Sequence, residues 1–104
     1  MTRSEERAAK NEAAFRQANE KIDARRRSLG LNSRTPYLCE CEDERCIELV
    51  RLTPSEYLQA RSEPRHFVVA PGHESRERVL DRSAEYVLVE KTGRGGQIAQ
   101  ESAE

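Results

Sequence analysis

The hydrophobic and polar positions of the first thirty residues predict a single long helix. Its apolar residues recur at intervals of three, four and seven, as on one stripe of a helix: Ala8, Phe15, Ala18, Ile22 and Leu29. Thr2 and Glu5 have the spacing of a capping box, and Gly30 is suited to end the helix. The sequence therefore predicts an amphipathic helix over residues 3–29, within an N-terminal segment 1–30.

The apolar stripe of this helix is narrow, because Asn11 and Arg25 interrupt it. It can hold the helix against one surface, but it is thin for a self-sufficient coiled coil. That surface is either the protein's own domain or a partner, including a second copy of the chain in a homodimer. The residues predicted to bind a partner are Phe15, Ile22, Arg25 and Arg26, and the run Arg25–Arg27 leaves nucleic-acid binding open as an alternative.

Beyond this helix the pattern changes to short apolar runs separated by turn residues, which predicts strands. The expected strands are Tyr37–Cys41, Ile47–Leu52, His66–Ala70 and Tyr86–Val89, and the first two form a hairpin around the acidic turn 42–45. Thr53, Pro54 and Glu56 have the arrangement of a helix start, so a short helix is expected over residues 54–62. Ser75 is predicted to begin a second short helix that carries Val79 and Leu80.

The composition fits one small domain that needs additional stabilisation. The chain has 104 residues, of which 36% are charged and 36% are hydrophobic, and it contains no Trp. A core drawn from such a chain supplies only a few kcal/mol, and domains of this size often rely on a disulfide or a metal. We expect an α+β fold: the helix of segment 1–30, a zinc-binding domain over 36–91 with a small, mainly antiparallel sheet and one or two short helices, and a flexible tail over 92–104.

Three cysteines within eight residues are the best candidate for that stabilisation. They follow the pattern Cys39-x-Cys41-x4-Cys46, and an odd number of clustered cysteines argues against a disulfide framework. Cys39 and Cys41 face the same side of an extended segment, and the following turn brings Cys46 toward them. Structural zinc sites take four ligands of this chemistry at tetrahedral corners. The hairpin is therefore predicted to carry a Zn²⁺ ion at its tip.

The fourth ligand has to come from another part of the chain, which contains two histidines. His73 follows a Pro-Gly turn at the end of a predicted strand, where a loop can direct an imidazole toward the ion. We therefore predict His73 as this ligand. The alternatives are His66, which lies within the strand, a carboxylate of Asp43, Glu42 or Glu74, or a site without a fourth protein ligand.

The surroundings of the cysteines favour a structural metal over catalysis or thiol redox chemistry. Reactive thiols need positive neighbours, whereas four carboxylates lie beside these cysteines: Glu40, Glu42, Asp43 and Glu44. A divalent cation is attracted by the same carboxylates and removes the thiol protons. Three thiolates and a neutral imidazole would leave a zinc site with a net negative charge, which makes a poor Lewis acid. A metal-dependent enzyme or a redox switch remains an alternative.

Several short motifs occur together along residues 37–91. They are Leu38-Cys39-Glu40-Cys41 with Cys46, Leu52-Thr53 with Glu56-Tyr57, the run from Phe67 to Glu74, and the run from Tyr86 to Lys91. In this combination the chain resembles a family of small bacterial proteins, mainly from actinobacteria, and the segments Asn11–Ala13 and Asn19–Ile22 fit the same pattern. The resemblance implies a bacterial source and a single site formed by the three cysteines and His73, and it implies no particular activity.

The acidic turn 42–45 and the narrow apolar stripe of the N-terminal helix favour an adaptor or regulatory role. The net charge is −1, and segment 1–30 carries eight Lys or Arg against five Asp or Glu, so no uniformly basic nucleic-acid surface is expected. The chain shows no signal peptide and no apolar stretch of the length that a membrane span needs, so a cytoplasmic location with reduced thiols is expected. We expect a non-enzymatic, zinc-stabilised module that binds an unidentified protein partner, with transcription as one candidate process.

Overall fold

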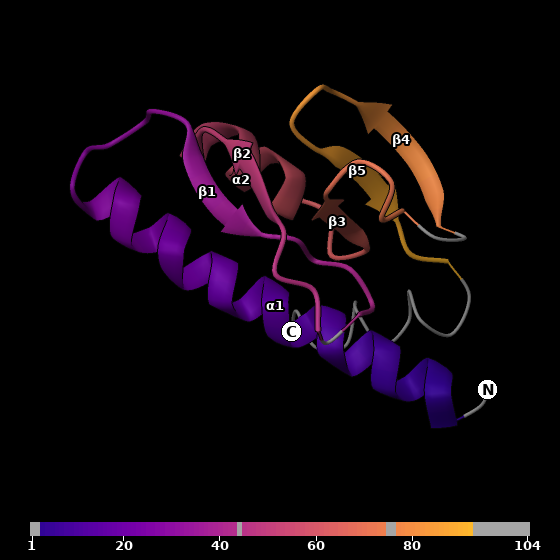
Figure 1. The fold of residues 1–104 in the computed structure, drawn as a ribbon. Helices are drawn as coiled ribbons and strands as arrows, with labels where there is room; N and C mark the ends of the chain where they lie inside the picture. The colour runs from indigo at the N-terminus through magenta and orange to yellow at the C-terminus, as the bar shows by residue number, and fades with distance from the viewer. Residues whose placement is uncertain (1–2, 44, 75–76, 93–104) are drawn as a thin grey trace.

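The computed structural model describes residues 3–43, 45–74 and 77–92 (Figure 1). The elements follow the chain in the order α1 (Arg3–Ser28), β1 (Thr35–Leu38), β2 (Leu49–Leu52), α2 (Pro54–Arg61), β3 (His66–Val69), β4 (Arg78–Arg82) and β5 (Val87–Glu90). Strands β1 and β2 form an antiparallel hairpin, and the second sheet is antiparallel with the order β3-β5-β4. The predicted α+β class, with a long N-terminal helix and small antiparallel sheets, is confirmed.

The segment that carries Val79 and Leu80 is a strand, so the prediction of a second short helix there is wrong. Strand β4 pairs with β5, with a bulge between Val79 and Asp81. Pairing satisfies the backbone groups of β5 on its second edge, which outweighs the weak helical pattern of the sequence. The predicted caps at Thr2 and Ser75 and the tail from residue 93 onward lie outside the described residues.

The hydrophobic core joins the two sheets to helix α2. The rings of Tyr37 on β1 and Tyr57 on α2 stack with centroids 4.5 Å apart. Val50 and Leu52 on β2 are fully buried beside them. The remaining buried apolar residues come from the second sheet and its ends, namely Phe67, Val68, Val69, Ala70, Val87 and Val89. Strand β5 is the central strand of its sheet, as its apolar sequence predicted.

Helix α1 is attached to this domain mainly through buried polar side chains. Glu12, Arg16, Asn19 and Asp23 follow one another at helical spacing, and each is 2% exposed or less. Asp23 Oδ1 accepts a hydrogen bond of 3.0 Å from the Tyr37 hydroxyl. The Arg16 guanidinium donates to the carbonyl of Pro64 and lies 4.5 Å from the centre of the Phe67 ring. The helix therefore packs on its own domain, one of the alternatives left open by the sequence.

The predicted apolar stripe lies beside this polar face. Ile22 packs against the core and Phe15 is half-buried, whereas Leu29 is 55% exposed. Arg25 is exposed and Arg26 is half-buried. Partner binding through these residues stays a prediction. Within the described part of the chain, no helix combines the length and apolar character that crossing a membrane requires.

A buried ionic cluster fixes α1 to the end of the second sheet at which β4 begins and β5 ends. Lys91 Nζ lies 2.7 Å from Glu12 Oε1 and 2.7 Å from Glu77 Oε1. Burial, followed by the neighbouring Glu77 carboxylate, raises the pKa of Glu12 to about 9, although Lys91 acts in the opposite direction. Two carboxylates share one ammonium group, so the folded protein retains a proton at this cluster near neutral pH.

Replacement of Glu12 by Gln is expected to change how stability depends on pH. Because the folded protein binds this proton more tightly than the unfolded chain, the contribution is fully present below about pH 4.5 and is lost as the pH rises toward about 9. The free energy of unfolding of the native protein should therefore fall relative to that of Glu12→Gln, by at most about 1.4 kcal/mol per pH unit. Urea denaturation of both proteins across this pH range measures the two free energies of unfolding. The prediction is contradicted if the value of the native protein minus that of Glu12→Gln stays constant or increases as the pH rises.

Candidate metal centre

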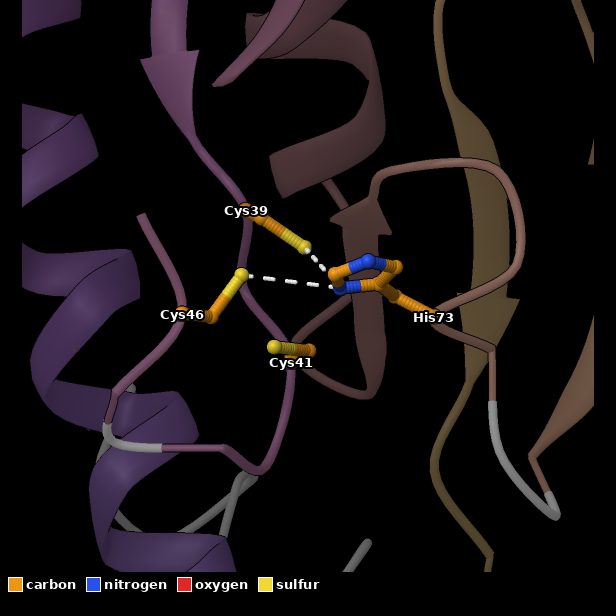
Figure 2. Close-up of side chains that lie close together, drawn as sticks. All are labelled: Cys39, Cys41, Cys46 and His73. Atoms are coloured by element: carbon orange, nitrogen blue, oxygen red, sulfur yellow. Dashed lines mark hydrogen bonds between the residues drawn. The ribbon is translucent and has the colours of Figure 1, made fainter. Parts of the chain in front are cut away.

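The structure brings the four predicted ligands together at one end of the β1–β2 hairpin (Figure 2). Cys39 and Cys41 directly follow β1, Cys46 precedes β2, and His73 follows β3. The three sulfur atoms and one imidazole nitrogen all lie within 4.8 Å of one another. Cys39 and Cys41 are buried, and Cys46 and His73 are half-buried.

The distances between the ligand atoms fit a tetrahedral metal ion. His73 Nδ1 lies 3.7 Å from Cys39 Sγ and 3.5 Å from Cys46 Sγ. Zinc bonds of about 2.3 Å to sulfur and about 2.0–2.1 Å to nitrogen place such atoms about 3.5–3.6 Å apart in a regular tetrahedron. Three thiolates and one imidazole are also a ligand set that structural zinc sites use. The residues present therefore fit Zn²⁺, and they can hold it without a large rearrangement.

A tight turn at the end of β3 presents His73 to the cysteines. The His73 N–H donates to the carbonyl of Ala70 at 2.9 Å, which closes a four-residue turn. Pro71 and Gly72 occupy its central positions, and Gly72 has a φ of 91°. This is the arrangement of a type II turn, in which the third position favours glycine because a side chain would be strained there. The Pro-Gly pair thus fixes the direction of the imidazole.

The other candidates for the fourth ligand are engaged elsewhere or lie at the surface. His66 begins β3, at the opposite end of the strand from His73, and its Nε2 lies 3.2 Å from Glu90 Oε2. Glu74 accepts a hydrogen bond from the Gly72 N–H and pairs with Arg82 at 3.1 Å. The side chains of Glu42 and Asp43 are exposed. The geometry thus places His73, and not His66, beside the three cysteines.

Burial determines the protonation of the thiols when no cation is bound. Removal from water raises the pKa of both Cys39 and Cys41. The Ala70 N–H donates to Cys39 Sγ at 3.1 Å, which favours the thiolate and partly opposes that effect. Neutral thiols are therefore the stable form without a cation, and a bound divalent cation would displace their protons.

Glu40 connects the metal centre to the rest of the fold. It lies between two of the cysteines and is fully buried. Its Oε2 accepts hydrogen bonds from the Tyr57 hydroxyl at 2.6 Å and from Asn19 Nδ2 at 2.9 Å, and its Oε1 accepts from the Val68 N–H at 3.0 Å. Burial raises the pKa of Glu40, whereas these three donors lower it. One carboxylate therefore joins α1, α2 and β3 at the segment that carries the ligands.

Asn19 extends this connection to strand β1. Its Nδ2 donates to the carbonyl of Leu38 at 2.8 Å, and its Oδ1 accepts from the Leu38 N–H at 2.7 Å. The side-chain amide thus binds the backbone of β1 as a neighbouring strand would.

The structural roles of Asn19 and Glu40 were not predicted from the sequence. The alternation of an extended segment, which turns Glu40 away from the cysteines on either side, was the one available signal.

A surface pocket opens beside the metal centre. It is lined by Cys41, Glu42, Asp43, Gly72 and His73. Its two exposed carboxylates would attract a divalent cation, so the pocket offers an entry path to the buried thiols.

No family model, no curated protein and no solved structure matches this chain. The resemblance to the actinobacterial family therefore stays a prediction.

Replacement of Glu40 by Gln is expected to destabilise the fold by about 2–3 kcal/mol, because an amide nitrogen cannot accept the hydrogen bonds that the carboxylate accepts. Amide hydrogen exchange along α1 and β3 should become faster at the same time. Urea denaturation and exchange measurements test this, with Glu48→Gln as the matched control at an exposed position before β2. Equal stabilities of the Glu40→Gln and Glu48→Gln variants would show that the buried carboxylate does not organise the site.

Proposed function

We propose that the protein is a non-enzymatic, zinc-stabilised module that acts as an adaptor for a protein partner. The observation that carries this proposal is the convergence of three thiols and one imidazole within 4.8 Å. Four protein ligands complete a tetrahedral shell and leave no position for a reacting water, which is the property of structural zinc sites. Zn²⁺ is favoured over harder cations, because soft thiolates select it over Mg²⁺ and Ca²⁺.

The ion would supply stability where the polypeptide alone is weak. A two-stranded hairpin such as β1–β2 is only marginally stable by itself. Binding of Zn²⁺ by Cys39, Cys41, Cys46 and His73 would fasten the connection between its strands to the end of β3. Structural zinc contributes on the order of 10 kcal/mol of binding free energy that is coupled to folding. That quantity is comparable with the whole stability of a small domain.

The side chains around the centre argue against catalysis. The complex with Zn²⁺ would carry a net negative charge, which makes the ion a poor Lewis acid. Glu40, which lies between Cys39 and Cys41, is fully buried and accepts three hydrogen bonds. Glu74 is paired with Arg82. Neither carboxylate is free to act as a general base on a substrate.

The basic end of α1 is partly neutralised, since Arg27 pairs with Asp23 at 2.7 Å. Arg25 is exposed and Arg26 is half-buried, so binding of nucleic acid by this end of the helix is the alternative function. Buried thiols that bind zinc persist in a reducing compartment, so we place the protein in the cytoplasm.

Removal of the metal is expected to unfold the protein. Purified under reducing conditions, it should contain one equivalent of zinc, and a strong chelator should abolish the cooperative thermal transition. Cys41→Ser should behave like the chelated protein. Elemental analysis and circular dichroism measure both effects. A Cys41→Ser variant that keeps its zinc and its thermal midpoint would show that the site is not structural.

The two histidines provide a matched pair for the fourth ligand. His73→Ala should weaken zinc binding, because it removes one of four ligands, whereas His66→Ala should leave it unchanged. Competition with a colorimetric chelator gives the affinity of both variants. The reverse order would assign the fourth position to His66.

A further inference from the structure

The two sheets of the described residues have four outer edges, of which two are occupied by other groups and a third is interrupted by a bulge. Asn19 occupies the free edge of β1 by binding both backbone groups of Leu38. The free edge of β3 is occupied by Glu40, whose N–H donates to the Val68 carbonyl at 2.8 Å and whose carboxylate accepts from the Val68 N–H. The free edge of β4 carries a bulge next to Leu80. Helices, side chains and bulges of this kind prevent pairing with another chain.

The fourth edge, on β2, is open. Because Asn19 takes up both backbone groups of Leu38, Leu38 and Leu49 form a pair without mutual hydrogen bonds, so the N–H and C=O of Leu49 point away from β1. Arg51, two residues further on, lies opposite Pro36, and this is again a pair without mutual hydrogen bonds. The N–H and C=O of Arg51 therefore also point away from β1. No described residue supplies a hydrogen bond to these outward groups of Leu49 or Arg51.

Apolar side chains are exposed on β2 and just before it. Ile47 is 90% exposed and Leu49 is 49% exposed. They alternate with Val50 and Leu52, which face the core and are fully buried. Leu38, which is half-buried, lies across from Leu49 on the outer face of the hairpin. An open edge and an exposed apolar face therefore coincide on β2, and this is the arrangement that adds a strand from another chain.

We propose that β2 pairs antiparallel with β2 of a second copy of this chain, so that the two hairpins form one continuous four-stranded sheet. The residues with outward backbone groups occupy odd positions, and an antiparallel strand can therefore pair with itself about a two-fold axis. With Leu49 opposite Leu49 of the second copy, each Ile47 meets the aliphatic stem of an Arg51. No like charges lie directly opposite each other in this register, and the exposed apolar side chains become covered.

The metal centre supports this edge without being part of it. Cys46 lies in the segment that leads into β2 and directly precedes Ile47. An ion held by Cys46 would therefore fix the position of this segment. Dimerisation is therefore to be measured on the zinc-loaded, full-length protein. Loss of dimerisation with retained zinc would affect only this inference, whereas loss of zinc would affect the proposed function.

Sedimentation equilibrium over a range of protein concentrations tests the proposal. The native protein should show a reversible monomer–dimer equilibrium. Leu49→Lys places a charge on the outer face, and Arg51→Pro removes an outward N–H that makes no bond within the molecule. Each should raise the dimer dissociation constant by about tenfold or more while zinc content is unchanged. The matched controls are Leu58→Lys on α2, where Leu58 is equally exposed at 49%, and Leu29→Lys at the end of α1.

Both controls should dimerise like the native protein. A native protein that stays monomeric at all concentrations overturns the proposal, and so does a dimer that Leu29→Lys dissociates and Leu49→Lys does not. A measurement without variants covers the case in which the substitutions impair folding. Hydrogen exchange of the Leu49 and Arg51 amides should slow as the concentration of the native protein rises, and exchange that is independent of concentration overturns the proposal as well.

Discussion

Four ligand atoms from two distant parts of the chain lie close enough to share one ion, and we propose that the fold depends on that ion. Three thiols come from the connection between β1 and β2, and one imidazole comes from the end of β3. Burial raises the pKa of Cys39 and Cys41, so these thiols stay protonated until a bound cation displaces their protons. The cluster lies beside the hydrophobic core that both sheets share, next to the hydrogen bonds that join Glu40 to Val68.

A second set of interactions makes the long helix part of the same unit. Helix α1 contributes few apolar residues to the core, and it is held instead by Glu12, Arg16, Asn19 and Asp23. Buried polar groups stabilise a fold only when their hydrogen bonds are satisfied, and Asn19 and Asp23 meet this condition with partners on β1. Glu40 is the common point, because it binds Asn19 from a position between two metal ligands. A metal ion held by these cysteines would therefore be physically linked to the docking of the helix.

Much of this architecture could be read from the sequence, for identifiable reasons. The Thr53-Pro54 start of α2, the apolar run of β5 and the Cys-x-Cys-x4-Cys pattern are local signals, and each depends on neighbouring residues alone. The attachment of α1 could not be predicted, since Glu12 and Asn19 look like solvent-facing residues until their distant partners are known. Strand β4 was misread for the same reason, because its pairing with β5 is a tertiary interaction.

X-ray absorption spectroscopy at the zinc edge reports the atoms that are bound to the metal in the intact protein. For a structural zinc site formed by the three cysteines and His73, we expect three sulfur ligands at about 2.3 Å and one nitrogen ligand at about 2.0–2.1 Å. A spectrum dominated by oxygen ligands, or a fully folded protein that takes up no zinc, would contradict it.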